Sequence, residues 1–317
     1  MSSPPIGVVG LGLLGRGIVA CLLARGFPVI AVTRTADEFE AARPALEQMQ
    51  AELVERGLID RPVVETWDAR LTSSTTCDAL RGVGFVIESV TEDLVTKQAV
   101  FDELERVLAP TAVVASNTSA IPISLLQQTR QHPERFVGMH WAEPAHATRF
   151  LEIIRGEATS DDTITRTADL ARQLGKDPTV CRKDVPGFIV NRIGYAMYRE
   201  ALALLEEGVA DVETIDRSLR NTLGLWAASC GPFRWIDLTG GPALYAKAME
   251  RVLPTLSTSA AVPAPMARLA DADARGIANG RGFYDYDPQS VHDWEDRQRR
   301  YVWQTAAWLD AEFPIDT

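Results

Sequence analysis

The sequence is poor in histidine and cysteine and has no long apolar run. Each of these two residue types occurs only four times in 317 residues. The cysteines are scattered, without a C-x-x-C pair or metal-ligand spacing, at Cys21, Cys77, Cys181 and Cys230. We therefore expect reduced thiols, a cytoplasmic location and no metal site. Without an apolar stretch of about 20 residues, and without a basic and apolar leader, we predict neither a membrane span nor a secretory signal.

Basic residues are outnumbered by acidic ones. Lys and Arg total 32 against 43 Asp and Glu, which gives a net charge of −11. This balance disfavours nucleic acids and anionic membranes as partners, because both repel an acidic surface. Hydrophobic residues make up 46% of the chain and charged residues 24%, as in ordinary globular proteins. The length suits one large domain or two ordinary ones.

A glycine-rich turn lies near the start of the chain. Gly10, Gly12 and Gly15 form a G-x-G-x-x-G pattern between a short apolar run and a helical segment, the context that a dinucleotide site requires. The first glycine permits a tight turn, the second lets a pyrophosphate approach the backbone, and the third lets the helix pack on the strand. Leu13 and Leu14 complete the predicted loop, where helix N–H groups face the phosphates. The alternative is a purely structural turn.

Short apolar runs alternate with helical segments before a change of pattern at Val185-Pro186-Gly187. Strands are expected at residues 6–9, 29–32, 85–88, 112–115, 136–140 and 150–154. The alternation is typical of an α/β fold with a doubly wound, mostly parallel sheet, here with a helical insertion near residues 37–70. We predict a dinucleotide-binding (Rossmann) domain over 1–185 and an all-helical domain over 186–317, because Pro186 disfavours helix at the residue before it.

Polar side chains occur where the predicted strands end. His140 follows an apolar strand, at the sheet edge where ligands bind, and imidazole is suited to taking a hydroxyl proton near neutral pH. Glu152, in the next strand, would fix the imidazole tautomer and stabilise the imidazolium. The alternatives are a structural histidine and a glutamate on a solvated face. The tetrad 116–119 either lines the ligand edge of the sheet or forms a polar turn or N-cap. Asn191 lies one turn into a mostly apolar helix, where its amide either bonds the backbone or reaches the cleft.

Eight stretches of the chain form an ordered set of motifs. They are GLGLLGRGIVA (10–20), VTEDLVTK (90–97), SNTS (116–119), GMHWAEP (138–144), FLEII (150–154), DVPGFIVNR (184–192), GPF…D (231–237) and GRGFYDY (280–286). This set resembles the L-3-hydroxyacyl-CoA dehydrogenase family over nearly the whole chain. The last two stretches resemble that family's helical C-terminal domain. The lens lambda-crystallin/L-gulonate dehydrogenase and carnitine dehydrogenase branches share much of the set.

The resemblance implies an NAD(P)-dependent oxidoreductase. Hydride would pass between the nicotinamide and C3 of a 3-hydroxyacyl group, and the cofactor would carry that chemistry while the protein supplies orientation and charge. The resemblance implies that His140 is the catalytic base and that Glu152 is its carboxylate partner. Ser119 and Asn191 are implied to contact the reacting oxygen. The residues implied to line the nicotinamide-ribose side are Glu92, Lys97 and Asn117. A homodimer through the helical domain is also implied.

One departure from the family concerns the cofactor. The family has an Asp at the end of the second strand that holds the ribose 2′-OH of NAD. Here the strand is followed by Thr33 and Arg34. An Arg binds a 2′-phosphate that an Asp would repel, so we expect NADP(H) to be favoured over NAD(H). The alternative is that Arg34 stacks on the adenine.

Two further departures concern the substrate. In this chain the family's H-x-x-N-P motif has Glu143 in place of the Asn. The carboxylate of Glu143 either raises the pKa of His140 by its charge, binds a polar or cationic group of the substrate, or points to solvent. The helical insertion is acidic, with Glu47, Glu52 and Glu55 against Arg56 over residues 47–56, whereas CoA phosphates favour a basic patch. Only Arg61 and Arg70 remain to supply one.

We therefore predict a 3-hydroxyacyl-CoA dehydrogenase-like enzyme. One alternative is a dehydrogenase of a small free 3-hydroxy acid, of the gulonate or carnitine type. Another is a non-catalytic relative that keeps the fold, against which the retained polar residues of the implied site argue. The expected partner is a small-molecule substrate, with no nucleic acid and no membrane.

Overall fold

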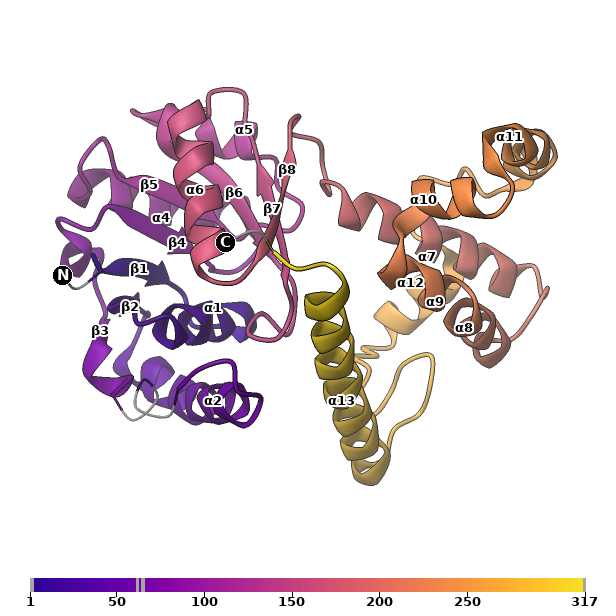
Figure 1. Ribbon diagram of the computed structural model, residues 1–317, viewed down its shortest axis with the longest axis horizontal. Helices are drawn as coiled ribbons and strands as arrows, with labels where there is room; N and C mark the ends of the chain where they lie inside the picture. The colour runs from indigo at the N-terminus through magenta and orange to yellow at the C-terminus, as the bar shows by residue number, and fades with distance from the viewer. Residues whose placement is uncertain (1–2, 61–62, 64–65, 316–317) are drawn as a thin grey trace. The chain divides into compact units, whose positions relative to one another are not determined.

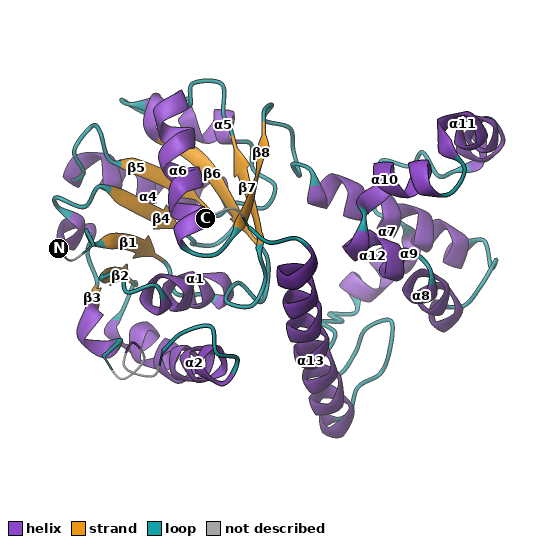
Figure 2. Cartoon of the chain, viewed as in Figure 1, coloured by secondary structure: helices purple, strands orange, loops and turns teal. Residues whose placement is uncertain are grey.

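Apolar runs in the first part of the chain build one eight-stranded sheet (Figures 1 and 2). The computed structural model describes residues 3–60, 63 and 66–315. The strands are β1 (Ile6–Val9), β2 (Val29–Val32), β3 (Leu71–Ser74), β4 (Phe85–Glu88), β5 (Val113–Ser116), β6 (Phe136–Trp141), β7 (Phe150–Ile154) and β8 (Asp177–Cys181). Their order in the sheet is β3-β2-β1-β4-β5-β6-β7-β8. Every neighbouring pair is parallel except β6 and β7, which are antiparallel.

Helices cover both faces of this sheet, which confirms the predicted doubly wound α/β fold (Figure 1). One face packs against α1 (Leu13–Ala24), α2 (Ala36–Glu55) and α6 (Asp161–Gln173), and the other packs against α4 (Leu94–Val107) and α5 (Ile123–Gln127). Side chains alternate between the two faces along each strand. In β1, for example, Val8 lies in the core under α1 and Val9 in the core under α4.

The structure adds elements that sequence reasoning missed. Strands β3 and β8 were not predicted, and both are edge strands of the sheet. Between them, β5 is shifted by one residue and β6 is one residue longer than expected. Helix α2, within the expected helical insertion, ends two residues before Gly57, which has φ +68°. Short 3₁₀ turns lie at Asp68–Arg70, Cys77–Leu80 and Pro133–Arg135.

The rest of the described chain is helical, as predicted. Its helices are α7 (Val190–Glu206), α8 (Val212–Asn221), α9 (Leu223–Ser229), α10 (Gly231–Leu238), α11 (Gly241–Val252), α12 (Ala264–Asp271) and α13 (Pro288–Glu312), with a 3₁₀ turn at Leu253–Thr255. The chain divides into a first unit, Met1–Arg192 with Ile315–Thr317, and a second unit, Ile193–Pro314. The first turn of α7 therefore belongs to the first unit.

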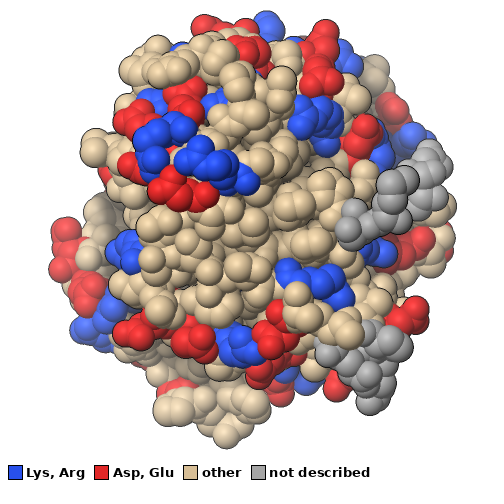
Figure 3. Space-filling view, turned by 90° about the vertical axis from the view of Figure 1, so that its left-hand side faces the viewer, with Lys and Arg blue, Asp and Glu red and all other residues tan. Residues whose placement is uncertain are grey.

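The surface of the first unit carries charges of both signs. On the face seen in Figure 3, acidic and basic side chains form small interspersed groups around a broad uncharged area. Such mixing produces no extended field of one sign on this face. In the described part of the chain, none of the helices combines the length and the hydropathy that a membrane span requires.

Candidate active site

Four polar side chains project from neighbouring strands on one face of the sheet. The register aligns Glu88 with Ser116, and His140 with Glu152. Because side chains alternate, the first two and Glu152 each share a face with an apolar residue two positions away that packs under α4 and α5, and His140 shares that face with Phe136, four positions before it. All four are buried. The strand pattern thus gathers a carboxylate, a hydroxyl, an imidazole and a second carboxylate at one side of the sheet.

The imidazole of His140 is held by a buried carboxylate. Its Nδ1 lies 2.9 Å from Glu152 Oε2, and the two residues are only 5% and 1% exposed. The rings of Phe150 and Phe188 lie 5.5 and 5.6 Å from the imidazole, centroid to centroid. A buried carboxylate needs a partner, and here it orients one ring nitrogen while the aromatic rings restrict the plane of the imidazole. The two residues are therefore in contact, and the catalytic roles expected of them from the sequence stay a prediction.

The second oxygen of Glu152 caps helix α7. Glu152 Oε1 accepts hydrogen bonds from the backbone N–H groups of Ile189 at 3.2 Å and Val190 at 3.0 Å. A negative charge is favourable at a helix N-terminus, where N–H groups lack intrahelical partners. The chain enters the helix through Gly187 and Phe188, both with positive φ, at 77° and 52°. One carboxylate thus binds both the imidazole and the start of the helix that carries the predicted Asn191.

A second carboxylate organises the loop after β5. Glu92 Oε1 accepts hydrogen bonds from the backbone N–H groups of Ser119 at 2.8 Å and Ala120 at 2.9 Å, and from Thr118 Oγ1 at 2.6 Å. Burial acts to raise the pKa of Glu92, but these hydrogen bonds and the charge of Lys97 outweigh it, so the pKa lies below its usual value. Ser119 is thereby fixed through its backbone.

Asn191 joins that loop. Its amide Nδ2 donates to the carbonyl oxygen of Ser119 at 2.8 Å. Because Glu152 caps the same helix start, the two residues implied to contact the reacting oxygen are linked to each other and to the carboxylate that holds His140. The structure thus brings all four expected catalytic residues into one hydrogen-bonded constellation.

Lys97 lies inside the protein rather than at its surface. Its side chain is fully buried, and its Nζ contacts Glu88 Oε1 at 2.8 Å and Glu92 Oε2 at 3.4 Å. Glu88 also accepts hydrogen bonds from Ser116 Oγ at 2.5 Å and from the backbone N–H of Val90 at 2.7 Å. The ammonium group is therefore surrounded by two carboxylates. Its observed contacts position Glu92, whereas the contact to a cofactor stays a prediction.

Asn117 links three strand ends. Its Nδ2 donates to Ser89 Oγ, and its Oδ1 accepts from the backbone N–H of Trp141, both at 3.0 Å. Ser89 directly follows β4, so the amide connects the ends of β4, β5 and β6. Both polar atoms of the amide are engaged, which orients it at the sheet edge expected for the nicotinamide-ribose.

The glycine turn fits a dinucleotide. Gly10 has φ +96°, and a Cβ there would lie 2.6 Å from the carbonyl oxygen of Ser89. A Cβ on Gly15 would overlap the carbonyl oxygen of Gly10, whereas one on Gly12 would meet nothing within 4 Å. Space is therefore kept open where a pyrophosphate approaches. Helix α1 begins directly after Gly12 with no side-chain cap, so its first N–H groups are available for an anion.

The remaining predicted cofactor residues lie beside this turn. Leu13 is exposed, and Leu14 packs partly against the core. Thr33 is buried and donates through Oγ1 to the carbonyl oxygen of Thr35 at 2.8 Å. Arg34 is exposed, with its guanidinium paired to Glu38.

The acidic residue that replaces the family's Asn lies close to the glycine helix. Burial raises the pKa of Glu143, and the charge of Arg16 opposes this. His146, three residues on, pairs with Glu52 at 3.0 Å, and burial lowers the pKa of this imidazole. His140 and His146 therefore have separate carboxylate partners.

Sequence reasoning missed Glu88, Ser116 as its hydrogen-bond donor, and Phe188. Glu88 ends the apolar run FVIE, and that position was itself a signal, because a buried carboxylate at a strand end requires a cation. Lys97, nine residues later, was already among the predicted residues. Nothing in the sequence marked Phe188 as the ring beside His140.

The fold and the site define a nicotinamide-dependent dehydrogenase, and comparison with known families agrees. A model of the 3-hydroxyacyl-CoA dehydrogenase NAD binding domain matches residues 5–185. A model of the C-terminal domain of the same family matches residues 187–286. The chain belongs to the 3-hydroxyacyl-CoA dehydrogenase family. It is an enzyme, and the prediction of hydride transfer between a nicotinamide cofactor and C3 of a 3-hydroxyacyl substrate is confirmed at the level of this family.

Two individual relatives carry different names. The 5-formyl-3-hydroxy-2-methylpyridine 4-carboxylate 5-dehydrogenase of Mesorhizobium japonicum is 35% identical over 286 residues, which are 90% of this chain and 92% of that protein. The probable 3-hydroxybutyryl-CoA dehydrogenase of Deinococcus radiodurans is 33% identical over 282 residues, 88% of this chain and 99% of that protein.

Solved structures with both of these activities in their names are similar to this chain. The crystal structure of a 5-formyl-3-hydroxy-2-methylpyridine 4-carboxylic acid 5-dehydrogenase, described as an NAD⁺ dependent dismutase, has a TM-score of 0.89 and 32% identity, covering 98% of this chain and 99% of that one. The (S)-3-hydroxybutyryl-CoA dehydrogenase of Ralstonia eutropha has a TM-score of 0.74 and 30% identity, covering 90% and 100%. The NAD-binding domain and these neighbours support NAD as the cofactor.

The buried lysine gives a prediction about stability. Replacing Lys97 by Met leaves the carboxylate of Glu88 buried without its cation, which typically costs about 3–5 kcal/mol. We expect K97M to lower the free energy of unfolding by that order, and the double variant E88Q/K97M to recover part of it. Chemical denaturation without cofactor measures both. The exposed Lys183 provides the control K183M, and an equal loss there would contradict the assignment.

Proposed function

We propose that His140 is the general acid and base of this dehydrogenase and that Glu152 holds it in place. The observation that carries the proposal is the 2.9 Å contact between His140 Nδ1 and Glu152 Oε2, made where both residues are buried. A carboxylate at Nδ1 fixes the hydrogen on that nitrogen and leaves Nε2 to exchange a proton with the substrate. It also stabilises the imidazolium that forms when the proton is taken up.

Each direction of the reaction then has a defined proton step. The bound nicotinamide supplies the hydride chemistry. During oxidation, Nε2 of His140 accepts the proton of the substrate hydroxyl, and during reduction it returns that proton to the new hydroxyl oxygen. Ser119 and Asn191 are proposed to contact the same oxygen, because their mutual hydrogen bond places them on one loop-and-helix junction. The Glu92 carboxylate keeps that loop in position.

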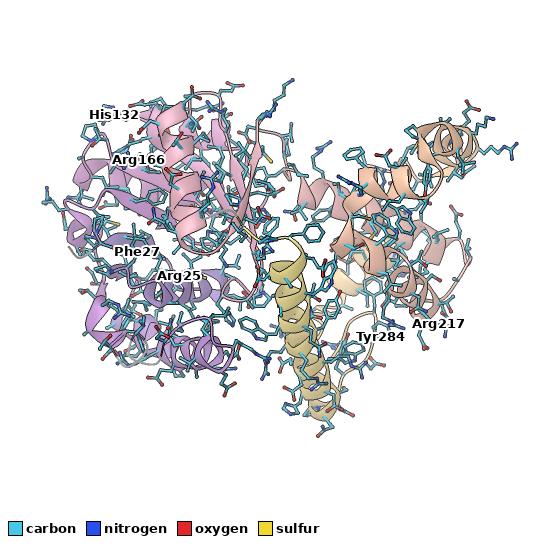
Figure 4. All side chains as sticks on the ribbon, viewed as in Figure 1. Arg25, Phe27, His132, Arg166, Arg217 and Tyr284 are labelled. Atoms are coloured by element: carbon cyan, nitrogen blue, oxygen red, sulfur yellow. The ribbon has the colours of Figure 1, made fainter. Side chains whose placement is uncertain are left out.

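Removing the imidazole tests this assignment. General acid–base catalysis typically contributes about 10²–10⁴-fold in rate, so we expect H140Q to lower kcat by this factor in both directions while the Kd of NADH stays within about twofold. Steady-state kinetics and a fluorescence titration with NADH give these values. His132 pairs with Glu134 on the surface of the first unit (Figure 4), so H132Q is the control. A kcat for H140Q close to that of wild type would refute the role.

We further propose that the acyl group is presented as a small free acid rather than as a CoA thioester. Helix α2 carries six acidic residues and one Arg over its 20 residues. That arginine, Arg43, pairs with Asp68 at 2.6 Å. The guanidinium of Arg70 donates hydrogen bonds to the backbone oxygens of Leu23 and Val63, and Arg61 lies outside the described residues. This surface opposes the phosphates of CoA.

One relative and one solved structure support the same choice. The Mesorhizobium japonicum relative is named for a pyridine carboxylate without CoA, and the solved structure of that name has a higher TM-score than the Ralstonia eutropha hydroxybutyryl-CoA enzyme. A hydroxybutyryl-CoA substrate is the second candidate, because the Deinococcus radiodurans relative carries that name.

Matched substrates separate the two candidates. Each 3-hydroxy acid is assayed as the free acid and as its CoA thioester, with NADH formation followed by absorbance. We expect kcat/KM to be at least about tenfold higher for a free acid, which is roughly 1.4 kcal/mol of transition-state binding. An aromatic hydroxymethyl or formyl carboxylate belongs in the panel. Preference for the thioesters throughout would establish the CoA alternative.

We also propose a homodimer formed through the second unit. Among the described residues of 193–314, only Leu202, Pro265 and Trp303 are buried. Large apolar side chains are exposed instead, including Phe233 at 83% and Leu225 at 73%. A unit of this size normally buries most of its apolar surface, so a second copy of the chain is the proposed cover.

A cavity in the second unit is also lined mainly by apolar side chains. It encloses about 520 Å³ among α7, α8, α12 and the segment before α13. Tyr284, marked in Figure 4, donates a hydrogen bond to Asp216 at 2.8 Å at this cavity. Burial and this contact raise the pKa of Tyr284 to about 12, so the phenol stays protonated as the donor.

The cytoplasmic location expected from the four cysteines, all free thiols, remains a proposal.

A charge placed on the exposed apolar surface tests the dimer. Burying an unpaired carboxylate in an interface is costly, so we expect F233E to shift the mass in light scattering after gel filtration from twice the chain mass of 34.7 kDa to the chain mass itself. V95E is the control, because Val95 is 76% exposed on the first unit. A wild-type protein that elutes as a monomer at micromolar concentration would rule the dimer out.

A further inference from the structure

The end of β2 lies directly beside the glycine turn. The backbone N–H of Gly10 donates to the carbonyl oxygen of Val32 at 2.9 Å, which places Thr33 and Arg34 next to the turn. In dinucleotide-binding folds the residue about 20 positions after the glycine fingerprint contacts the ribose of the adenosine: an acid there binds the 2′-OH of NAD, and an Arg accommodates the 2′-phosphate of NADP. By sequence alone, this position holds an Arg.

The structure brings a carboxylate to the same place from the next helix. Glu38, in the first turn of α2, accepts a hydrogen bond from the backbone N–H of Arg34 at 3.1 Å and pairs with its guanidinium. The backbone N–H of Glu38 donates to Thr35 Oγ1 at 3.2 Å, which is the N-cap of the helix. These contacts fix the carboxylate at the end of β2. The hydrogen bond from Arg34 keeps the pKa of Glu38 below its usual value.

We propose that Glu38 makes this enzyme select NAD(H) over NADP(H), by supplying from α2 the acid that the end of β2 lacks. Its ionised oxygens accept a hydrogen bond from a ribose 2′-OH, as a carboxylate at this site does in NAD enzymes. A 2′-phosphate carries up to two negative charges and would stand against the carboxylate. Glu38 also occupies the guanidinium of Arg34, the group that would otherwise bind the phosphate.

The two charges therefore have opposite effects on cofactor choice. Arg34 alone favours the 2′-phosphate, which was the sequence expectation, and Glu38 cancels it. The side chain of Arg34 is 90% exposed, so it is free to turn toward a phosphate once its partner loses its charge. Selectivity is then a property of the pair, and removing the acid should expose the latent preference of the arginine.

Nucleotide titrations of a few variants test the proposal. The Kd values of NADH and NADPH are measured by nucleotide fluorescence without substrate. We expect wild type to bind NADH more tightly, E38Q to move the ratio of the two Kd values toward NADPH by about tenfold or more, and E38Q/R34A to lose that gain, because charge-assisted hydrogen bonds to the phosphate need the guanidinium. E40Q, on the exposed side of the same helix, is the control.

Two outcomes overturn the proposal. One is a wild-type enzyme that binds NADPH more tightly than NADH, and the other is a ratio that E38Q changes by less than about twofold. If the gain of NADPH binding persists in E38Q/R34A, Arg34 is not the group that binds the 2′-phosphate, and that part of the proposal is wrong. Circular dichroism of E38Q checks that α2 is still formed. The inference rests on nicotinamide cofactor use but not on the proton chemistry, so these Kd values decide it even if the role of His140 fails.

Discussion

The structure depends on one carboxylate shared between two partners. Glu152 gives one oxygen to the imidazole of His140 and the other to the first N–H groups of α7. A buried carboxylate is stable only when its lone pairs are used, and here one oxygen binds an imidazole and the other caps a helix. The imidazole acquires a fixed tautomer, and the helix that carries Asn191 acquires its cap. The charge that orients the proposed base therefore also fixes the start of the helix that carries a second proposed site residue.

The sheet explains why these groups meet. Alternation along β4, β5, β6 and β7 sends Glu88, Ser116, His140 and Glu152 to one face. Loops that follow β4 and β5 then supply Glu92 and the Ser119 backbone. The result is a continuous set of ion pairs and hydrogen bonds from the buried Lys97 to the helix start. Most of its side chains are buried, which suits the proposed role of holding a proton acceptor within hydrogen-bond reach of the substrate.

Much of this arrangement was predictable because its residues stand in local patterns. The glycine turn, the apolar strands and the polar groups at strand ends follow from spacing and from the rule that ligands bind at the carboxyl ends of strands. Strands β3 and β8 were not predictable in the same way. Both are edge strands with partly exposed faces, so neither requires the apolar alternation that marks an inner strand.

Side-chain pairing was the other limit of the sequence. Lys97 was expected at the cofactor, yet only the fold shows that Glu88, nine residues earlier, takes its charge into the interior. Arg34 was expected to favour a phosphate, yet only the helix geometry brings Glu38 onto it. The sequence gives the charge of each side chain, but tertiary packing determines which neighbouring group pairs with that charge.

The most direct test of the shared carboxylate is ¹⁵N nuclear magnetic resonance of the histidine side chains. The account predicts that the neutral imidazole of His140 carries its hydrogen on Nδ1, that this hydrogen resonates far downfield because it is bonded to the carboxylate, and that the signal is lost in E152Q while that of His132 is unchanged. A neutral imidazole protonated on Nε2, or an Nδ1–H resonance that E152Q leaves in place, would contradict it.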